Sequence, residues 1–381
     1  MMSKKYEENL KLIQEGLACT NEKPISCYSG SAPGAVMMGM TVAEFVEKPV
    51  EGALAAIEMC KRLEKEAGPL HSLNYSADSM NSVVGITMLW YSRVLIPGKE
   101  ISENSVWQVQ EKQLIDSSAY DEILKNGFDN FVQQNILPRI IDMDYMKRSM
   151  KVAAEGAHVI EQAYAELGIP RLRGGRGPVV PFEQLCGMRS MSQFYMDCYK
   201  MPDKLKEVSD AIFAEKTAQA EDYLKKTKDD PTFIGAWIGG WRTASAMLNQ
   251  KIWDKLVWPY MKTAAELLNK YDKVAIMHLD QDWNRDIARF GEIPAGKIIL
   301  NTDGMTDLPR ARRLLPKHAL MGDVPATLLT TGSTEQVRDY VNRLIDNVGP
   351  QGLFVCPGCD TPVNAKFENL VAMVKTTNEW H

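Results

Sequence analysis

Short apolar runs alternate with helical patterns in the C-terminal half of the chain. The runs cover residues 273–277, 297–300, 318–321 and 352–355, and each ends at polar or small residues. Between them, apolar residues recur three and four positions apart, which is typical of amphipathic helices. A repeated order of strand, short loop and helix predicts parallel strands with helices outside. We therefore expect an α/β fold, a (β/α)8 TIM barrel, with an open doubly wound sheet as the alternative.

The clearest helix is predicted over residues 333–348. Ser333 and Gln336 have the spacing of a capping box, in which each side chain bonds the backbone N–H of the other residue. Apolar residues then follow at helical spacing up to Val348. Gly349 and Pro350 come next, and both are typical of the end of a helix.

The N-terminal half is less regular. Residues 1–22 predict a helical extension, and residues 24–30 predict a first strand that ends in small residues. Further helices are expected over residues 41–67 and 143–167. The glycine-rich residues 171–181 predict a loop.

We expect one uroporphyrinogen-decarboxylase-sized barrel domain over residues 1–381, because the length suits a barrel with additions. Residues 68–135 mix turn and aromatic signals without a clear period. We interpret them as an inserted cap over one end of the barrel.

Charge and composition exclude several classes of protein. The chain has 44 Lys and Arg against 49 Asp and Glu, a net charge of −5, so it lacks the basic surface of a nucleic-acid binder. No apolar stretch is long enough to span a membrane, and the charged N-terminus lacks the core of a signal peptide. We expect a cytoplasmic protein with no membrane or nucleic-acid partner. Seven scattered cysteines do not indicate a disulfide framework.

Polar groups follow the predicted strands. In a (β/α)8 barrel the loops after the strands share one face, where active sites gather. These side chains are therefore expected to converge, although they are far apart in sequence: His278, Asp280, Asp303, Asp323 and Cys359.

His278 and Asp280 point to the same side if the strand continues through them. Imidazole nitrogen, carboxylate oxygen and thiolate sulfur all bind zinc, and three protein ligands leave one position for a substrate. The competing interpretation is a histidine at a strand end followed by an aspartate that caps a helix.

Cys356 and Cys359 form a CxxC motif, which is found in redox dithiols and in zinc knuckles. The chain has no second CxxC, and the Pro-Gly between the cysteines suits a tight turn. We therefore expect one functional cysteine of the two.

The segment GAWIGGW (235–241) is a glycine-rich strand end that permits close approach of a ligand. Either pocket lining or core packing explains the tryptophans of this half of the chain. They are Trp237, Trp241, Trp253, Trp258 and Trp283. Similarly, Arg171, Arg173 and Arg176 suit either an anionic substrate or a solvated loop.

Several motifs resemble the uroporphyrinogen decarboxylase superfamily, in the branch of corrinoid-dependent methyltransferases. They are MGDVP (321–325), LLTTGSTEQV (328–337), FVCPGCDTP (354–362) and NLVAMV (369–374), with PGKEI (97–101) and WQVQE (107–111) upstream. This resemblance implies a (β/α)8 barrel. Decarboxylases of the family carry arginines after the first strand, where this chain reads CYSGSAP (27–33). A porphyrinogen decarboxylase is therefore not expected.

The resemblance also bears on the metal. Methyltransferases of this branch that serve coenzyme M hold zinc with His-x-Cys and a distant Cys. His278 matches the first ligand and Cys359 the last, while Asp280 stands in place of the middle cysteine. A carboxylate makes the centre a harder Lewis acid, which suits an oxygen ligand better than a sulfur ligand.

The resemblance thus implies the methyltransferase component of an anaerobic O-demethylase. Its substrate would be a small aromatic methyl ether, and its acceptor the Co(I) corrinoid (cobalamin) of a partner protein, with zinc at His278, Asp280 and Cys359. Without metal, His278 or Asp280 would act as general acid. We expect Asp303 and Asp323 to act beside them as proton-relay groups, and Tyr28 and Trp241 to touch the aromatic ring.

Three alternatives stay open. The first is transfer from a corrinoid to a thiol or to tetrahydrofolate, and the second is a non-catalytic protein that binds a tetrapyrrole or corrinoid. The third is a redox enzyme that uses Cys356 and Cys359. The direction of methyl transfer and assembly into a homodimer are also left open.

Overall fold

The computed structural model describes residues 3–75 and 83–381. Within these residues, eight parallel strands close into a barrel in the order β1-β10-β9-β8-β7-β6-β5-β2. The predicted TIM barrel is therefore confirmed, and the open sheet is excluded. The strands are β1 (Ile25–Tyr28), β2 (Ser72–Tyr75), β5 (Arg171–Gly175), β6 (Gly235–Gly240), β7 (Val274–Leu279), β8 (Ile298–Thr302), β9 (Ala319–Val324) and β10 (Leu353–Pro357).

The four apolar runs of the C-terminal half become β7, β8, β9 and β10, as predicted. Every residue of these four strands is buried. Such strands are covered on both faces, which explains why they are continuous apolar runs and not alternating ones.

The predicted loop over residues 171–181 is wrong in its first half, because Arg171–Gly175 forms β5. This strand pairs with β2 and β6, and its register shifts between Arg173 and Gly175. A Cβ on Gly175 would overlap the ring of Phe233, so the glycines let neighbouring residues approach the strand closely. Glycines with this packing role cannot be distinguished from loop glycines by sequence alone.

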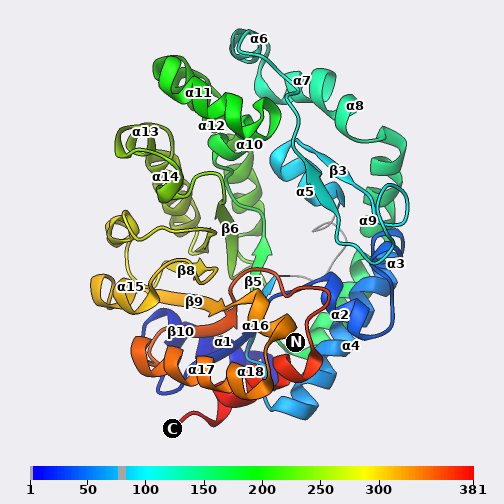
Figure 1. Cartoon of the computed structure of the whole chain (residues 1–381), viewed down its shortest axis with the longest axis vertical. Coiled ribbons are helices and arrows are strands. Elements are labelled where there is room, and N and C mark those ends of the chain that lie inside the picture. Colours follow the sequence, from blue (N-terminus) through cyan, green and yellow to red (C-terminus); the bar gives the residue numbers. More distant parts are fainter. Residues whose placement is uncertain (1–2, 76–82) are drawn as a thin grey trace.

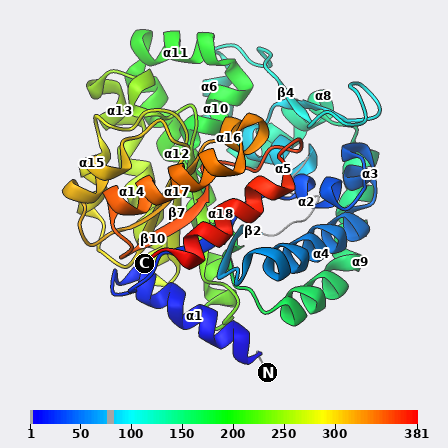
Figure 2. The same ribbon diagram turned by 60° about the horizontal axis from the view of Figure 1, so that its bottom comes forward.

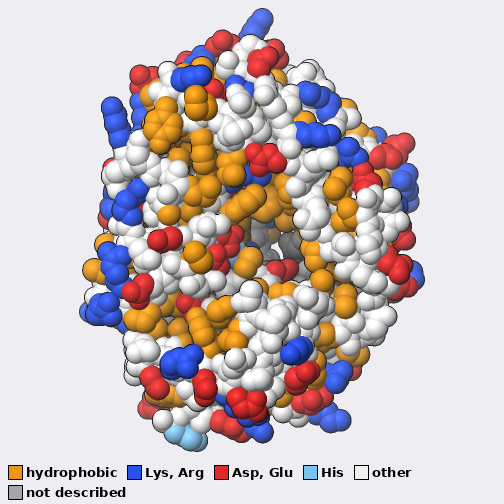
Figure 3. Space-filling view, viewed as in Figure 1, with side chains coloured by type: hydrophobic (Ala, Val, Ile, Leu, Met, Phe, Trp, Pro, Cys, Tyr) orange, Lys and Arg blue, Asp and Glu red, His pale blue; other side chains and the backbone are white. Residues whose placement is uncertain are grey.

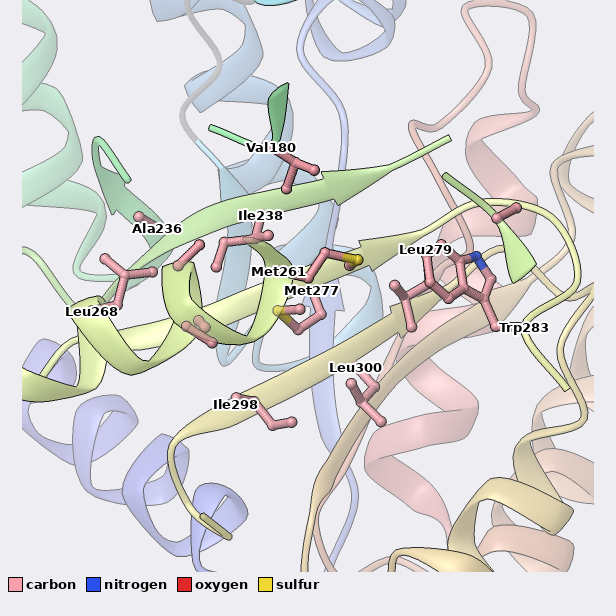
Figure 4. Packing of buried hydrophobic residues seen from close by; sticks show 14 of the residues in the cluster. Val180, Ala236, Ile238, Met261, Leu268, Met277, Leu279, Trp283, Ile298 and Leu300 are labelled. Carbon is pink, nitrogen blue, oxygen red and sulfur yellow. The ribbon is translucent and has the colours of Figure 1, made fainter. Parts of the chain in front are cut away.

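Helices cover the outside of the barrel. Figure 4 shows one part of this layer, where α14 (Trp258–Lys270) presents Met261 and Leu268 to the outward side chains of β6, β7 and β8. The other helices after barrel strands are α2 (Ala32–Met37), α3 (Val42–Glu47), α4 (Pro49–Ala67), α10 (Pro181–Arg189), α11 (Met191–Lys200), α12 (Pro202–Thr227), α13 (Gln250–Leu256), α15 (Leu308–Leu314), α16 (Ala326–Thr331), α17 (Thr334–Val348) and α18 (Phe367–Glu379), with the 3-10 turns η3 (Ser245–Met247) and η4 (Ile287–Glu292).

The predicted boundaries of the clearest helix hold. Ser333 caps α17, and its side chain and that of Gln336 form the reciprocal capping box. The helix predicted over residues 41–67 is instead two helices, α3 and α4, because Pro49 cannot continue α3 and begins α4.

The helix α1 (Lys4–Leu17) closes the amino end of the barrel (Figure 2). Ile13 and Leu17 of α1 pack against the inward side chains of the strands, and we call this set the inner apolar cluster. Gly16 permits the close approach, because a Cβ there would overlap Ile25. The cluster comprises Ile13, Leu17, Ile25, Cys27, Leu172, Val274, Ile276, Ile299, Ala319, Met321, Phe354 and Cys356.

Further elements lie between β2 and β5, and those labelled α6, α7 and α8 stand at the end of the molecule opposite α17 and α18 (Figure 1). The predicted cap over residues 68–135 begins too early, because β2 within it is a barrel strand. Residues 76–82 of that cap lie outside the described residues. The elements of this region are α5 (Val83–Trp90), β3 (Arg93–Leu95), β4 (Gln108–Gln110), α6 (Ala119–Asn126), α7 (Phe128–Phe131), η2 (Val132–Ile136), α8 (Leu137–Ile140) and α9 (Met143–Leu167).

Among the described residues, no helix combines the length and the apolar character needed to cross a bilayer.

Candidate active site

His278 lies on β7, two residues beyond Ile276 and four beyond Val274. Both of those residues belong to the inner apolar cluster, and alternate residues of a strand face the same side. The imidazole therefore points into the barrel, above the apolar cluster and toward the carboxyl ends of the strands. We call this open end of the barrel interior the mouth.

Asp280 and Cys359 meet His278 in the mouth. His278 Nε2 lies 3.2 Å from Asp280 Oδ1 and 3.6 Å from Cys359 Sγ. One ligand atom from each of the three residues lies within 4.8 Å of the other two. Two loops, one after β7 and one after β10, thus bring together residues that are almost eighty positions apart. We call these three side chains the His-Asp-Cys cluster.

Asn301 of β8 orients the imidazole. Its Oδ1 lies 2.7 Å from His278 Nδ1, while its Nδ2 donates to the carbonyl oxygens of Met321 and Gly358. Those two bonds place the amide oxygen toward the ring, so Nδ1 carries the proton that Asn301 accepts. His278 Nε2 therefore faces Asp280 and Cys359, which is the arrangement that a neighbouring hydrogen bond imposes on a metal-binding histidine.

The polar layer continues around the barrel. Asn74 of β2 donates to Asn301 Oδ1 at 3.3 Å, and it accepts a hydrogen bond from Arg173 Nε at 2.9 Å. Sequence reasoning missed Asn74 and Asn301 as site residues. Asn301 directly follows an apolar run, which is the signal that selected His278, but an asparagine at that place is also an ordinary strand end.

Charge couples the cluster. Burial alone lowers the pKa of the His278 imidazole, but Asp280 and Cys359 outweigh it and hold this pKa well above its ordinary value. Burial acts to raise the pKa of Asp280, while His278, Cys359 and Arg173 together bring it below its ordinary value. The pair therefore favours imidazolium and carboxylate, unless a metal replaces the proton on Nε2.

The spacing of the three donor atoms fits a tetrahedral zinc site. Zinc–ligand bonds of about 2.0–2.3 Å at tetrahedral angles separate neighbouring donors by about 3.3–3.6 Å. The two distances from His278 Nε2, 3.2 and 3.6 Å, match this requirement. Asp280 and Cys359 are also partly accessible from outside. A fourth ligand position would thus be open to a substrate.

Asp303 holds the backbone beside the cluster. Its Oδ2 accepts a hydrogen bond from the backbone N–H of Gln281, the residue after Asp280. Gly358, which precedes Cys359, packs so closely on Asp303 that a Cβ on this glycine would contact the Asp303 backbone. Asp303 therefore positions both loops that carry the cluster.

Asp323 has a different environment. Its Oδ1 accepts a hydrogen bond from the Tyr340 hydroxyl of α17, at 2.8 Å, so the carboxyl group faces the outer helix. Burial raises the pKa of Asp323 to about 6, and the hydrogen bond from Tyr340 partly offsets this increase. The structure does not bring Asp323 into the His-Asp-Cys cluster, and a proton-relay role for it stays a prediction.

The two predicted ring contacts lie elsewhere. Tyr28 belongs to the outer hydrophobic layer, because it alternates with Cys27 of the inner apolar cluster. Trp241 lies just beyond β6, where its ring packs against Trp90 with 5.5 Å between centroids. Neither residue is brought to the His-Asp-Cys cluster by the printed contacts of the described chain, and their roles in substrate binding stay predictions.

Glu183 of α10 is a positioning residue that sequence reasoning missed. It is buried, and its Oε1 accepts hydrogen bonds from the backbone N–H groups of Trp241, Arg242 and Thr243. Burial raises the pKa of Glu183, while these bonds and Arg242 lower it. The carboxylate thus fixes the chain where it leaves β6 for the mouth.

The two cysteines of the CxxC motif are in different places. Cys356 is fully buried in the inner apolar cluster, where burial raises its pKa well above the ordinary value. Cys359 is exposed in the loop beyond β10. One cysteine thus belongs to the core and the other to the mouth.

These features define a (β/α)8 barrel whose polar groups gather at the carboxyl ends of the strands, the face where barrel enzymes hold their active sites. The sequence profile of the family uroporphyrinogen decarboxylase (URO-D) matches residues 174–380, which is more than half of the chain. The chain belongs to the uroporphyrinogen decarboxylase family, as the motifs predicted.

A solved structure of a methyltransferase from Methanosarcina mazei is similar to this chain. The TM-score is 0.67 at 12% sequence identity, and the match covers 98% of each chain. At this identity the likeness shows a shared fold. No curated protein matches the chain in sequence.

Proposed function

We propose that this protein is a methyltransferase of the corrinoid-dependent branch, and that it transfers a methyl group from a phenyl methyl ether to the Co(I) corrinoid of a partner protein. The observation that carries the proposal is the convergence of His278, Asp280 and Cys359 in the mouth of the barrel. The fold shared with a methyltransferase from Methanosarcina mazei supports it.

The donor atoms favour an oxygen-containing substrate. Asp280 contributes a hard carboxylate oxygen in a position where thiol-directed relatives carry a cysteine, so a metal held here prefers oxygen to sulfur as its fourth ligand. The first strand ends without arginine, which disfavours a substrate with many carboxylates.

The reaction breaks the bond between the methyl carbon and the ether oxygen, and it forms a bond between that carbon and cobalt. The electron pair of the broken bond stays on the oxygen, and the phenolate formed takes up a proton. Cobalt goes formally from Co(I) to Co(III). A zinc ion held by His278, Asp280 and Cys359 would polarise the ether oxygen as a Lewis acid.

The residues of this chain have defined tasks in that reaction. Asn301 keeps Nδ1 of His278 protonated and turns Nε2 toward the substrate position. Asp303 holds the loop that carries Asp280. In protein without metal, the raised pKa of His278 keeps a proton on Nε2 that can pass to the leaving oxygen.

A panel of methyl donors with reduced corrinoid as acceptor tests the proposal. We expect methyl–cobalt absorbance with methoxyarenes, and none with methanol, methylamines or methanethiol. Transfer from a methylated corrinoid to a thiol or to tetrahydrofolate, without ether cleavage, would instead identify the reverse component. Corrinoid binding without any transfer would identify a carrier, and either result would overturn the proposal.

Metal analysis of protein purified without chelator tests the zinc assignment. We expect about one zinc per chain and its loss in Cys359→Ser. Cys356→Ser is the matched control, because Cys356 lies in the inner apolar cluster and should not affect zinc content. A zinc content near zero in the unaltered protein would favour proton donation by His278.

A further inference from the structure

Trp237 is the one large side chain that β6 contributes to the barrel interior. In the register of β6 with β7, Gly235, Trp237 and Gly239 pair with Val274, Ile276 and His278. Paired residues of parallel strands face the same side of the sheet. Trp237 therefore faces inward between two glycines, while Ala236 and Ile238 face the outer helices.

The indole of Trp237 is half-buried, whereas the other residues of β6 are buried. A side chain that faces the interior of a closed barrel is accessible to water only through an end of the barrel, and α1 closes the amino end. The exposed part of the indole consequently opens into the mouth. Figure 3 shows a hollow near the centre of one face of the molecule, with hydrophobic side chains along its border.

The ring leans toward the His-Asp-Cys cluster. A Cβ on Gly239 would overlap the Cζ2 and Cη2 atoms of Trp237, so the indole lies over the backbone of this glycine. Gly239 is the register partner of His278. The centroids of the Trp237 and His278 rings are 6.3 Å apart, and their planes differ by 36°.

A flat apolar surface thus borders the side chains that would bind the reacting oxygen. We infer that Trp237 is the stacking surface for the aromatic ring of the methyl donor and determines the preference for aromatic over aliphatic donors. This inference rests on the proposed function, because it names the part of the donor that the site recognises. It replaces neither His278 nor Asp280, which act on the oxygen.

The charges around the ring favour a neutral arene over a cationic methylammonium, which tryptophan faces also bind. His278 tends to be protonated, and the charge of Arg173 acts on Asp280 across the same site. These two positive groups oppose a cationic ligand. An arene that stacks on Trp237 with its methoxy oxygen at the His-Asp-Cys cluster has no such penalty.

Binding is measured by calorimetry with guaiacol and with an aliphatic methyl ether of similar size, which separates recognition from methyl transfer. The variants are Trp237→Leu and Trp237→Phe. Trp380→Leu is the matched control, because Trp380 is a half-buried tryptophan beyond the end of α18. In Trp237→Leu we expect about tenfold weaker binding of guaiacol, as loss of one aromatic contact implies, with no change for the aliphatic ether.

Trp237→Phe keeps an aromatic face, so we expect binding within about threefold of the unaltered protein. It also keeps the test decisive if Trp237→Leu does not fold. Equal loss for aromatic and aliphatic ethers, or unchanged guaiacol binding in a folded Trp237→Leu protein, would overturn the inference. Because no step measures methyl transfer, a protein that fails the donor panel can still pass this test, and the reverse also holds.

Discussion

The two ends of the barrel contain side chains from the same strands but have opposite character. At the amino end, Ile276 and Phe354 pack under α1 in a set of residues that are apolar and buried. At the carboxyl end, His278 and Asn301 stand on these or neighbouring strands and bond to other polar groups. A step of two residues along β7, from Ile276 to His278, separates the two environments.

This difference shows how the barrel divides its tasks. The amino end buries apolar area and stabilises the fold. The carboxyl end keeps partly accessible donors and acceptors close together, and burial of such groups costs stability unless each is bonded. Substitutions at the two ends should therefore affect different measurements, and the following experiments are chosen to test that separation.

The largest effect is expected for His278→Ala. Loss of the ring removes both the metal ligand and the proton donor, so we expect methyl transfer to fall by about a thousandfold or more. The unfolding midpoint should change little. His318→Ala is the matched control, since His318 is a buried histidine just before β9, at the amino end, where its Nε2 bonds the Ile293 carbonyl. Methyl transfer that persists in His278→Ala would refute the assignment.

Phe354→Ala tests the other end. The ring is fully buried in the inner apolar cluster, so its loss should lower the free energy of unfolding by about 3–5 kcal/mol. Denaturant unfolding measures this loss. Zinc content per folded molecule should be retained. A Phe354→Ala protein that keeps its stability but loses zinc would contradict the separation of the two ends.

Asp323→Asn tests the cost of a buried carboxyl group near the mouth. The pKa of Asp323 is about 6 in the folded protein and about 3.9 in the unfolded chain, so the folded state binds the proton more tightly. Stability from this group is therefore present at low pH and decreases as the pH rises from about 4 to about 6. The shift corresponds to about 3 kcal/mol.

An asparagine at position 323 stays neutral and can still accept the Tyr340 hydrogen bond. Relative to the unaltered protein, Asp323→Asn should gain stability as the pH rises from 4 to 7, with the two unfolding curves measured side by side. A constant difference across this range would show that Asp323 titrates normally. Methyl transfer measured on the same variant tests the predicted proton-relay role.

The smallest effect is expected for Asn301→Leu. This change removes the acceptor for His278 Nδ1 and leaves the three ligands in place, so zinc affinity should fall by about 10- to 100-fold. Competition with a chelator measures it. Asn9→Leu is the control, because Asn9 is a buried asparagine of α1 that bonds the Gly168 carbonyl at the closed end. Equal zinc affinity in both variants would show that Asn301 does not orient the ring.

Sequence patterns predicted the regular parts of this molecule well. The apolar runs of β7 to β10 and the capping box of α17 are local signals, and the structure retains them. They failed at β5, where glycines that permit close packing resemble loop glycines. They also located the cap too early, because β2 is short and has no strong period.

For the candidate site, local spacing placed His278 and Asp280 on one side of a strand. It did not select Asn301 or Trp237, because an asparagine or tryptophan near a strand end is common without function. The predicted ring contact Tyr28 is in the outer layer, since its face depends on which of two alternating sets points inward.

The amino-acid sequence by itself determined which segments are strands and helices and which residue types stand at the strand ends. These properties follow from periods of two and 3.6 residues, which depend only on neighbours along the chain. Tertiary structure decided that Cys359 meets His278, that Asn301 bonds its ring and that Trp237 opens into the mouth. Those contacts depend on barrel closure and strand register, which arise from packing between segments far apart in sequence.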